Sequence, residues 1–371
     1  MQPAAVPDLE QLTDLWNRRL AERERGILDF YAGRRRWMVI QRPAYHIYGE
    51  CNSVPDIVTN NLRQMQAWLA CPWTDELPHL EPWIGTGVYA NAFGCPYLWR
   101  QGEAPDVRSR YRSIEEVRGI AKPDWRSSPV MGMVLEAIDA LLEATRGRLP
   151  ISSTDPQSPY DSATLALDTS EFFTACYTEP ETVASFVGII TELLIEFTRV
   201  QWERIGDGRV ARPGHSIPSH TTLTGINLSD DNLAVASPLI NERVSLPADR
   251  RLSEEFGGLF LHSCGVWHHT MRAAVAHGAT GICCAVQRAT DPTPDDPAKI
   301  RAALAGTDVM VRARFGQDTE HLLTDLPKIA GPGLRIIVDI LREEPDDAAW
   351  ARIAETNYRR ASELLARLYG A

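Results

Sequence analysis

The sequence predicts an α/β fold built from consecutive parallel βα units. Short apolar runs alternate with amphipathic segments at a steady pace through the C-terminal half, and the chain closes on a long amphipathic segment. The 371 residues are enough for two average domains or for one large barrel. We find no internal repeat, low-complexity tract or clear linker, so a single domain is the economical interpretation.

The elements of the C-terminal half follow one another as strand, helix, strand. Apolar runs predict strands, and segments with apolar residues at helical spacing predict the helices between them. Strands are expected at 258–262, 281–286, 308–312 and 334–339. Helices are expected at 267–277, 297–305, 318–329 and 347–369.

The N-terminal half is less regular but contains the same kinds of element. Helices are expected at 8–26 and 55–70, a strand at 37–41, and a long core-facing helix at 180–206. Two stretches, 72–110 and 207–235, are irregular and rich in Pro, Gly, Trp and His. Loops of that length inside a compact domain are usually functional, so we expect both to take part in a site.

Composition excludes several classes of function. The chain has 49 acidic and 38 basic side chains and a net charge of −11, which does not favour binding to nucleic acid. The short basic run Arg34-Arg35-Arg36 is interpreted as a solvated strand entrance. Seven cysteines, with no apolar signal segment and no apolar run of membrane-spanning length, predict a cytoplasmic protein that does not bind membranes.

His262 and Cys264 are the strongest candidates for chemistry. They follow an apolar strand, and because strand side chains alternate between faces, both are expected on the same side of the sheet. Imidazole nitrogen and thiolate sulfur bind zinc at about 2.0 to 2.3 Å, and a catalytic zinc needs three protein ligands and one open position. The alternative is a buried His and a buried Cys that are neighbours without a metal.

Several segments together resemble a known superfamily. They are Leu228-Ser229-Asp230-Asp231-Asn232-Leu233 with the following Ala-Val-Ala-Ser-Pro, Leu261-His262-Ser263-Cys264-Gly265, Trp37-Met38-Val39-Ile40-Gln41, Asp75-Glu76-Leu77-Pro78, Gly85-Thr86-Gly87, Phe93-Gly94 and Ser158-Pro159-Tyr160-Asp161. This set resembles the uroporphyrinogen decarboxylase superfamily and is nearest in pattern to its zinc-dependent methylcorrinoid methyltransferases. The resemblance implies one (β/α)8 TIM barrel over residues 1–371, with a helical extension at 1–30 and long loops and the active site at the C-terminal ends of the strands.

The chain departs from the decarboxylase pattern after its first strand. The true decarboxylase resembles Arg-Gln-Ala-Gly-Arg-Tyr there, with arginines that hold the carboxylates of the porphyrinogen. This chain has Ile40-Gln41-Arg42-Pro43-Ala44-Tyr45, which leaves Arg42 alone. The resemblance therefore implies zinc-dependent methyl transfer between a corrinoid and a thiol or similar acceptor. Metal-free decarboxylation of uroporphyrinogen or another carboxylated substrate is the alternative, and a non-catalytic ligand-binding barrel is a third hypothesis.

The third zinc ligand has two candidates. The related methyltransferases complete their site with a cysteine at the end of the last strand, where this chain has Asp339, an acceptable oxygen ligand or a plain helix cap. In the strand after His262, alternation sends Cys283 and Cys284 to opposite faces, so at most one of them enters the barrel. The resemblance favours Cys283, and both cysteines can equally be small packing residues.

Further candidates complete the predicted site. Asp231, His220 and Tyr160 are expected to be catalytic or to orient the catalytic groups, and solvated or capping roles are the plain alternatives. Substrate-binding candidates are Arg42, Asp75, Trp83, Phe93 and Asp230. The implied cofactor is zinc, with a methylcorrinoid as substrate or on a partner protein, and the substrate is a small molecule. A homodimer is an open alternative to the monomer.

Overall fold

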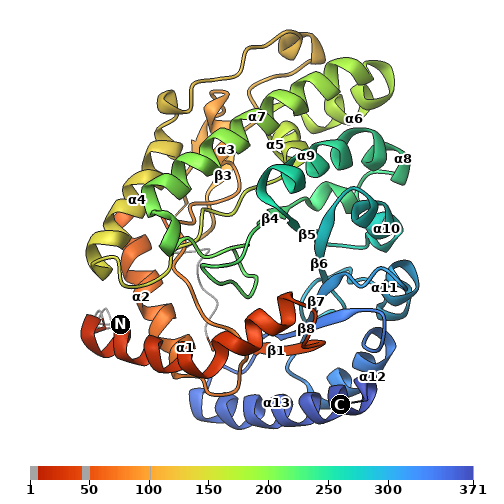
Figure 1. The fold of residues 1–371 in the computed structure, drawn as a ribbon. Helices are drawn as coiled ribbons and strands as arrows, with labels where there is room; N and C mark the ends of the chain where they lie inside the picture. Colours follow the sequence, from red (N-terminus) through yellow and green to blue (C-terminus); the bar gives the residue numbers. More distant parts are fainter. Residues whose placement is uncertain (1–6, 44–50, 101, 371) are drawn as a thin grey trace.

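A six-stranded parallel sheet forms the centre of the molecule, with helices around it (Figure 1). The computed structural model describes residues 7–43, 51–100 and 102–370. The strands are ordered β1-β8-β7-β6-β5-β4, and every neighbouring pair is parallel. They are β1 (Trp37–Gln41), β4 (Ile226–Ser229), β5 (Leu259–His262), β6 (Ala279–Ala285), β7 (Met310–Phe315) and β8 (Arg335–Ile340).

The C-terminal half confirms the predicted alternation of strands and helices. Its connecting helices are α10 (His268–Ala276), α11 (Pro297–Leu304), α12 (Thr319–Ile329) and α13 (Asp347–Tyr369). Asp296, Asp318 and Asp346 cap the last three by accepting backbone N–H bonds of the first turn, which is why each helix begins there. The strand expected at 308–312 is shifted and lies at Met310–Phe315.

The part of the chain before β5 holds more regular structure than the sequence indicates. Its helices are α1 (Leu9–Tyr31), α2 (Val54–Ala70), α3 (Val88–Ala92), α4 (Pro129–Thr145), α5 (Pro159–Ala166), α6 (Thr169–Thr178), α7 (Pro180–Ile205), α8 (Pro238–Ile240) and α9 (Leu246–Phe256). The stretch 72–110, expected to be irregular, contains α3 and the hairpin of β2 (Tyr97–Leu98) and β3 (Asp106–Val107). The stretch 207–235 contains β4, which at four residues is too short to show a period.

The predicted barrel is found only in part, because eight regular strands are not formed in the described ranges. Isolated parallel bridges join Leu80 to Ile151 and Ile151 to Val210 between the edge strands β1 and β4. The Asn227 N–H of β4 donates to the Pro213 carbonyl (2.9 Å) on the same side. Proline lacks an N–H and breaks a ladder, and Pro78, Pro150 and Pro213 lie in these segments, so regular strands do not extend through them.

An apolar cluster packs against one face of the sheet, short of its C-terminal edge. It consists of Ile27, Phe30, Met38, Ile40, Leu77, Ile217, Phe260, Cys283, Met310 and Ile337. The first two belong to α1, so the N-terminal helix closes this interior from one end. A larger cluster packs the other face of the sheet against the helices and includes Cys284. Among the described helices, none is both long and apolar enough to cross a membrane.

Candidate metal centre

Asp231, His262 and Cys264 come together at the C-terminal ends of β4 and β5. The two strands are neighbours, with Ser229 opposite His262, so the turns that follow them lie side by side. His262 Nε2 lies 3.5 Å from Cys264 Sγ and 3.8 Å from Asp231 Oδ1. One ligand atom from each residue lies within 4.8 Å of the others, and in the described part of the chain this is the group suited to a metal ion.

The three donors fit zinc. They supply one nitrogen, one sulfur and one oxygen, a mixed set that zinc accepts in tetrahedral sites. Cys264 is exposed and Asp231 has half of its side chain in solvent, so one side of the group is open. Three protein ligands with an open fourth position characterise catalytic zinc sites, whereas structural sites are closed.

The protein alone keeps this group in a low-charge state. Partial burial of the sulfur, together with nearby Asp231, raises the pKa of the Cys264 thiol to about 12, and Arg314 opposes the shift. Burial also holds the pKa of His262 well below its usual value, with Arg314 and Arg312 acting in the same direction. His262 is therefore the neutral imidazole that binds metals, and a cation would be needed to make the thiolate accessible.

Two buried carboxylates fix the turns that carry these ligands. Asp161, at the start of α5, accepts from the Asp231 N–H (2.7 Å) and the Asn232 N–H (3.0 Å). Asp291 accepts from the Gly265 N–H (2.9 Å), directly after Cys264. Asp231 itself accepts from the Cys264 N–H (2.7 Å). Sequence reasoning missed the positioning roles of Asp161 and Asp291, and the only signal was the place of Asp161 in the Ser-Pro-Tyr-Asp motif.

Cys283 lies on the opposite side of the His262 ring from Cys264. It faces His262 across the β5–β6 pair, and its Sγ is 3.3 Å from His262 Nδ1. Arg312 Nη1 donates to the same sulfur at 3.4 Å. Because the two imidazole nitrogens point in different directions, a metal bound at Nε2 is not within reach of a ligand at Nδ1. The structure places Cys283 in the interior, as alternation requires, but outside the metal group.

Asp339 is also outside the group. Its carboxylate forms a buried ion pair with Arg312 Nη2 on the neighbouring strand β7. The third place in the group belongs to Asp231, for which the sequence predicted a supporting role. The ligand roles proposed for Asp339 and Cys283 thus stay predictions that this geometry does not favour.

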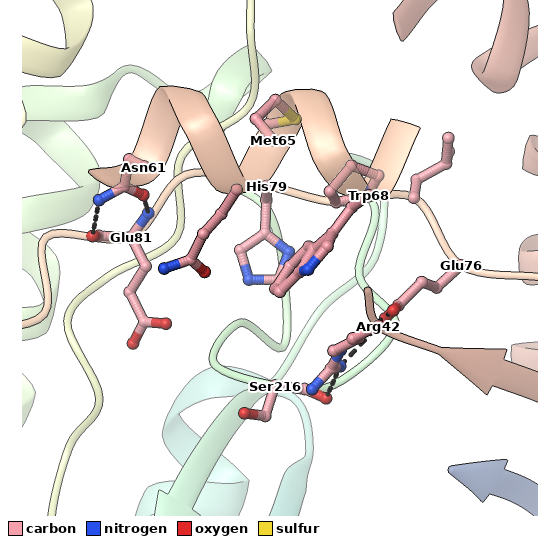
Figure 2. Close-up of a pocket in the computed structure, with 11 residues that line it drawn as sticks. Arg42, Asn61, Met65, Trp68, Glu76, His79, Glu81 and Ser216 are labelled. Atoms are coloured by element: carbon pink, nitrogen blue, oxygen red, sulfur yellow. Dashed lines mark hydrogen bonds and ion pairs between the residues drawn. The ribbon is translucent and has the colours of Figure 1, made fainter. Parts of the chain in front are cut away.

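Arg42 is engaged by the protein. Its Nε and Nη2 donate to the two carboxylate oxygens of Glu76, both at 3.0 Å, and its side chain also reaches the Ser216 carbonyl (Figure 2). The guanidinium lies over the Trp68 ring, 5.3 Å from its centroid. These residues line a cavity of about 20 Å³, large enough for one water molecule.

The loop after α7 brings His215 close to two buried carboxylates. His215 Nδ1 lies 2.8 Å from Glu81 Oε1, and its Nε2 lies 3.6 Å from Asp155 Oδ2. Asp155 in turn accepts from the Ser229 hydroxyl (3.1 Å) at the end of β4. His220, the predicted catalytic histidine of this loop, instead contacts Glu24 of α1, with 3.1 Å between His220 Nε2 and Glu24 Oε1.

The remaining predicted residues lie in packed surroundings. Asp230 is fully buried and bonds the Ser245 hydroxyl, and Tyr160 is fully buried against Phe172. Asp75 accepts from Arg35, from the Val39 N–H and from the Tyr358 hydroxyl. Trp83 and Phe93 are buried core residues, the latter stacked edge-on against Phe186. The structure does not bring these five side chains to the metal group, and their substrate and catalytic roles stay predictions.

Comparisons with known proteins bear on the same fold. A family model for uroporphyrinogen decarboxylase (URO-D) matches residues 85–208. The predicted resemblance to this family is confirmed. The metal group lies outside the matched residues, so the URO-D match itself does not describe that group. No curated protein matches the chain.

Solved structures extend the similarity over most of the chain. Seventeen chains are significantly similar. One is a methyltransferase from Methanosarcina mazei, with a TM-score of 0.60 and 14% sequence identity over 84% of this chain and 86% of that chain. At this identity the similarity establishes a shared fold. The chain therefore both resembles the URO-D family in sequence and has the same fold as this methyltransferase.

Proposed function

We propose that this protein is a zinc-dependent methyltransferase that transfers a methyl group between a corrinoid and a thiol or similar acceptor. The observation that carries the proposal is the Asp231, His262 and Cys264 group, with its mixed donors and open side. The similar fold of a methyltransferase supports it. The corrinoid is proposed as a free substrate or as the prosthetic group of a partner protein.

We also infer that the complete architecture is a (β/α)8 barrel. The six strands account for most of the wall, and the segments bridged through Leu80, Ile151 and Val210 join one another between β1 and β4. In such barrels the active site lies at the C-terminal ends of the strands. The metal group occupies that end of β4 and β5, which agrees with a catalytic role.

The roles of the residues follow from their contacts. Asp231, His262 and Cys264 would hold zinc, and bound zinc lowers the pKa of a coordinated thiol so that a thiolate exists at neutral pH. Asp161 and Asp291 keep the ligand turns in place through backbone N–H bonds. Cys283 contacts His262 Nδ1 and would orient the ring without binding the metal.

Decarboxylation is the second candidate, favoured by the family match. A decarboxylase for a substrate with many carboxylates needs several available arginines. Arg42, the one arginine retained from that pattern, is already paired with Glu76 through two hydrogen bonds. The metal group has no evident use in metal-free decarboxylation, so we prefer methyl transfer.

Metal analysis tests the proposal. Purified protein loaded with zinc and dialysed is expected to retain about one zinc per chain, and His262→Ala, Cys264→Ala and Asp231→Asn are expected to lose it. Cys283→Ala and Asp339→Asn are discriminating variants that should retain zinc. Cys176→Ala, in α6, is the control for an unrelated cysteine.

An activity assay tests the reaction itself by following the loss of methylcobalamin absorbance in the presence of thiols. Turnover by the wild type that disappears in Cys264→Ala supports the proposal. A wild type without stoichiometric zinc, or carbon dioxide release from uroporphyrinogen that His262→Ala leaves unchanged, contradicts it.

A further inference from the structure

A second cavity, rich in arginine, lies at the C-terminal ends of β1, β7 and β8. It has a volume of about 140 Å³ and is lined by Arg42, Thr290, Arg312, Arg314, Asp339, Ile340 and Leu341. Arg312 and Arg314 share one face of β7 because they are two residues apart. The volume suits the head group of a small molecule and is below the usual size of a pocket for a complete drug-sized ligand.

Two of the three arginines have carboxylate partners. Arg42 is paired with Glu76, and Arg312 is paired with Asp339. Arg314 has no carboxylate within ion-pair distance among the described residues. Its Nε and Nη2 are buried and lack a hydrogen-bond partner there. Buried charged donors without partners cost free energy, so their presence indicates a group that binds to them.

The cavity also lies beside the metal group. Arg312, which lines the cavity, donates to Cys283 Sγ at 3.4 Å, and that sulfur lies 3.3 Å from His262 Nδ1. The backbone at Arg314 is held to the segment that follows β6, because the Arg314 carbonyl accepts from the Thr290 hydroxyl (3.1 Å) and from the Val286 N–H (3.1 Å). A molecule bound to Arg314 can therefore extend toward the three metal ligands.

We propose that Arg314 binds the carboxylate of a small monoanionic substrate and directs its other end toward Asp231, His262 and Cys264. Three arginines line the cavity and two carboxylates pair with them, so one net positive charge remains to match one negative charge, which favours a carboxylate over a phosphate dianion. The guanidinium fork also fits the two oxygens of a carboxylate. The inference that the other end of the substrate reacts at the metal group depends on the proposed function. The inference that Arg314 binds a carboxylate does not.

Calorimetry with two thiols tests the substrate class. Zinc-loaded wild type is expected to bind mercaptoacetate about tenfold or more tightly than 2-mercaptoethanol, which lacks the charge. Arg314→Gln is expected to abolish this preference while retaining zinc and its affinity for 2-mercaptoethanol. Arg314→Lys, which keeps the charge without the fork, is expected to retain part of the preference. Arg250→Gln, an exposed arginine of α9, is the matched control and should behave as the wild type.

A second measurement separates this inference from the zinc proposal. In EDTA-treated protein, acetate should raise the unfolding temperature more than acetamide, and Arg314→Gln should remove the difference. If zinc is absent but this difference is present, the subsite stands and the methyltransferase proposal falls. An unchanged carboxylate preference in Arg314→Gln overturns the inference, as does tighter binding of inorganic phosphate than of acetate. If Arg314→Gln does not fold, Arg314→Lys provides the test. A carboxylate preference that is weaker in Arg314→Lys than in the wild type supports the inference, and an unchanged preference overturns it.

Discussion

The His262 ring separates two chemically different sulfur atoms. Cys264 lies at Nε2 together with Asp231, and Cys283 lies at Nδ1 together with Arg312. Cys283 accepts from the Arg312 guanidinium, whereas Cys264 lies near both the Asp231 carboxylate and Arg314, so the two thiols have different electrostatic surroundings. At the residue scale, the side of the imidazole on which a cysteine lies determines whether it can share a metal with His262.

Three buried carboxylates lie beneath the turn that carries Asp231. They are Asp161, Asp230 and Asp249, and Ser245 donates to Asp230 and contacts Asp249. Burial, with a smaller contribution from the nearby Asp161, raises the pKa of Asp249 to about 8, and the hydrogen bond from Ser245 opposes the shift. Burial also raises the pKa values of Asp161 and Asp230 well above their usual range. The folded protein therefore holds protons that the unfolded chain releases.

This arrangement predicts a pH-dependent stability. Because the folded pKa of Asp249 is raised above its unfolded value, its favourable contribution is complete below about pH 4 and is lost as the pH rises through about 8. The free energy of unfolding of the wild type should fall relative to that of Asp249→Asn between pH 5 and 8, by at most about 1.4 kcal/mol per pH unit. Urea unfolding of both proteins across this range measures the difference, and parallel pH profiles would contradict the prediction.

At the scale of the element, β5 and β6 fit together through a missing side chain. A Cβ on Gly281 would lie 2.3 Å from the Phe260 ring, which fills the interior beside it. The glycine in the middle of a strand, normally unfavourable, is explained by this close approach. Neighbouring side chains on these strands point to opposite faces of the sheet. Phe260 and Cys283 face the interior cluster, and Cys284 faces the helices.

Gly281→Ala is expected to lower the free energy of unfolding by about 1–3 kcal/mol, because the added methyl overpacks the interior. Denaturant unfolding measures the change. Gly188→Ala in α7 is the control, since nothing lies within 4 Å of its added Cβ, and it should be neutral or stabilise by about 0.5–1 kcal/mol. Equal effects of the two substitutions would show that Phe260 does not restrict the site.

Elements of the C-terminal half were predictable because its strands are apolar runs and its helices have apolar residues at helical spacing, three of them after an Asp cap. Strand β4 was not, since its four residues include two polar ones and are too few to establish a period. The segments around Ile151 and Val210 were also missed. They are held to the sheet by single bridges, which depend on their neighbours in space and leave no pattern in the sequence.

At the scale of the whole molecule, α1 covers the apolar cluster on one face of the sheet. Ile27 and Phe30 of this helix join Met38, Phe260 and Met310 in one apolar cluster. Arg23 of α1 donates to the carbonyls of Cys71 and Glu76, which ties the helix to the segment after α2. The predicted N-terminal helical extension is thus an integral part of the core.

Phe30→Ala is expected to destabilise the whole protein by about 3–5 kcal/mol, because it opens a cavity in a completely buried cluster. Thermal and urea unfolding should both report the loss in a single transition. Tyr177→Ala, at a site in α6 that is 67% exposed, is the control and should change stability by no more than about 0.5 kcal/mol. Two separate transitions in Phe30→Ala would contradict a core that unfolds as one unit.

The sequence by itself determined the order of strands and helices in the C-terminal half and the pair His262 and Cys264 at a strand end. Both follow from periods of two and 3.6 residues, which are local properties of the chain. Only the tertiary structure decided that Asp231, rather than Asp339 or Cys283, completes the group, and that Arg314 lacks a carboxylate partner among the described residues. Those outcomes depend on which strands are neighbours and which charges are already paired, and such contacts join residues far apart in the sequence.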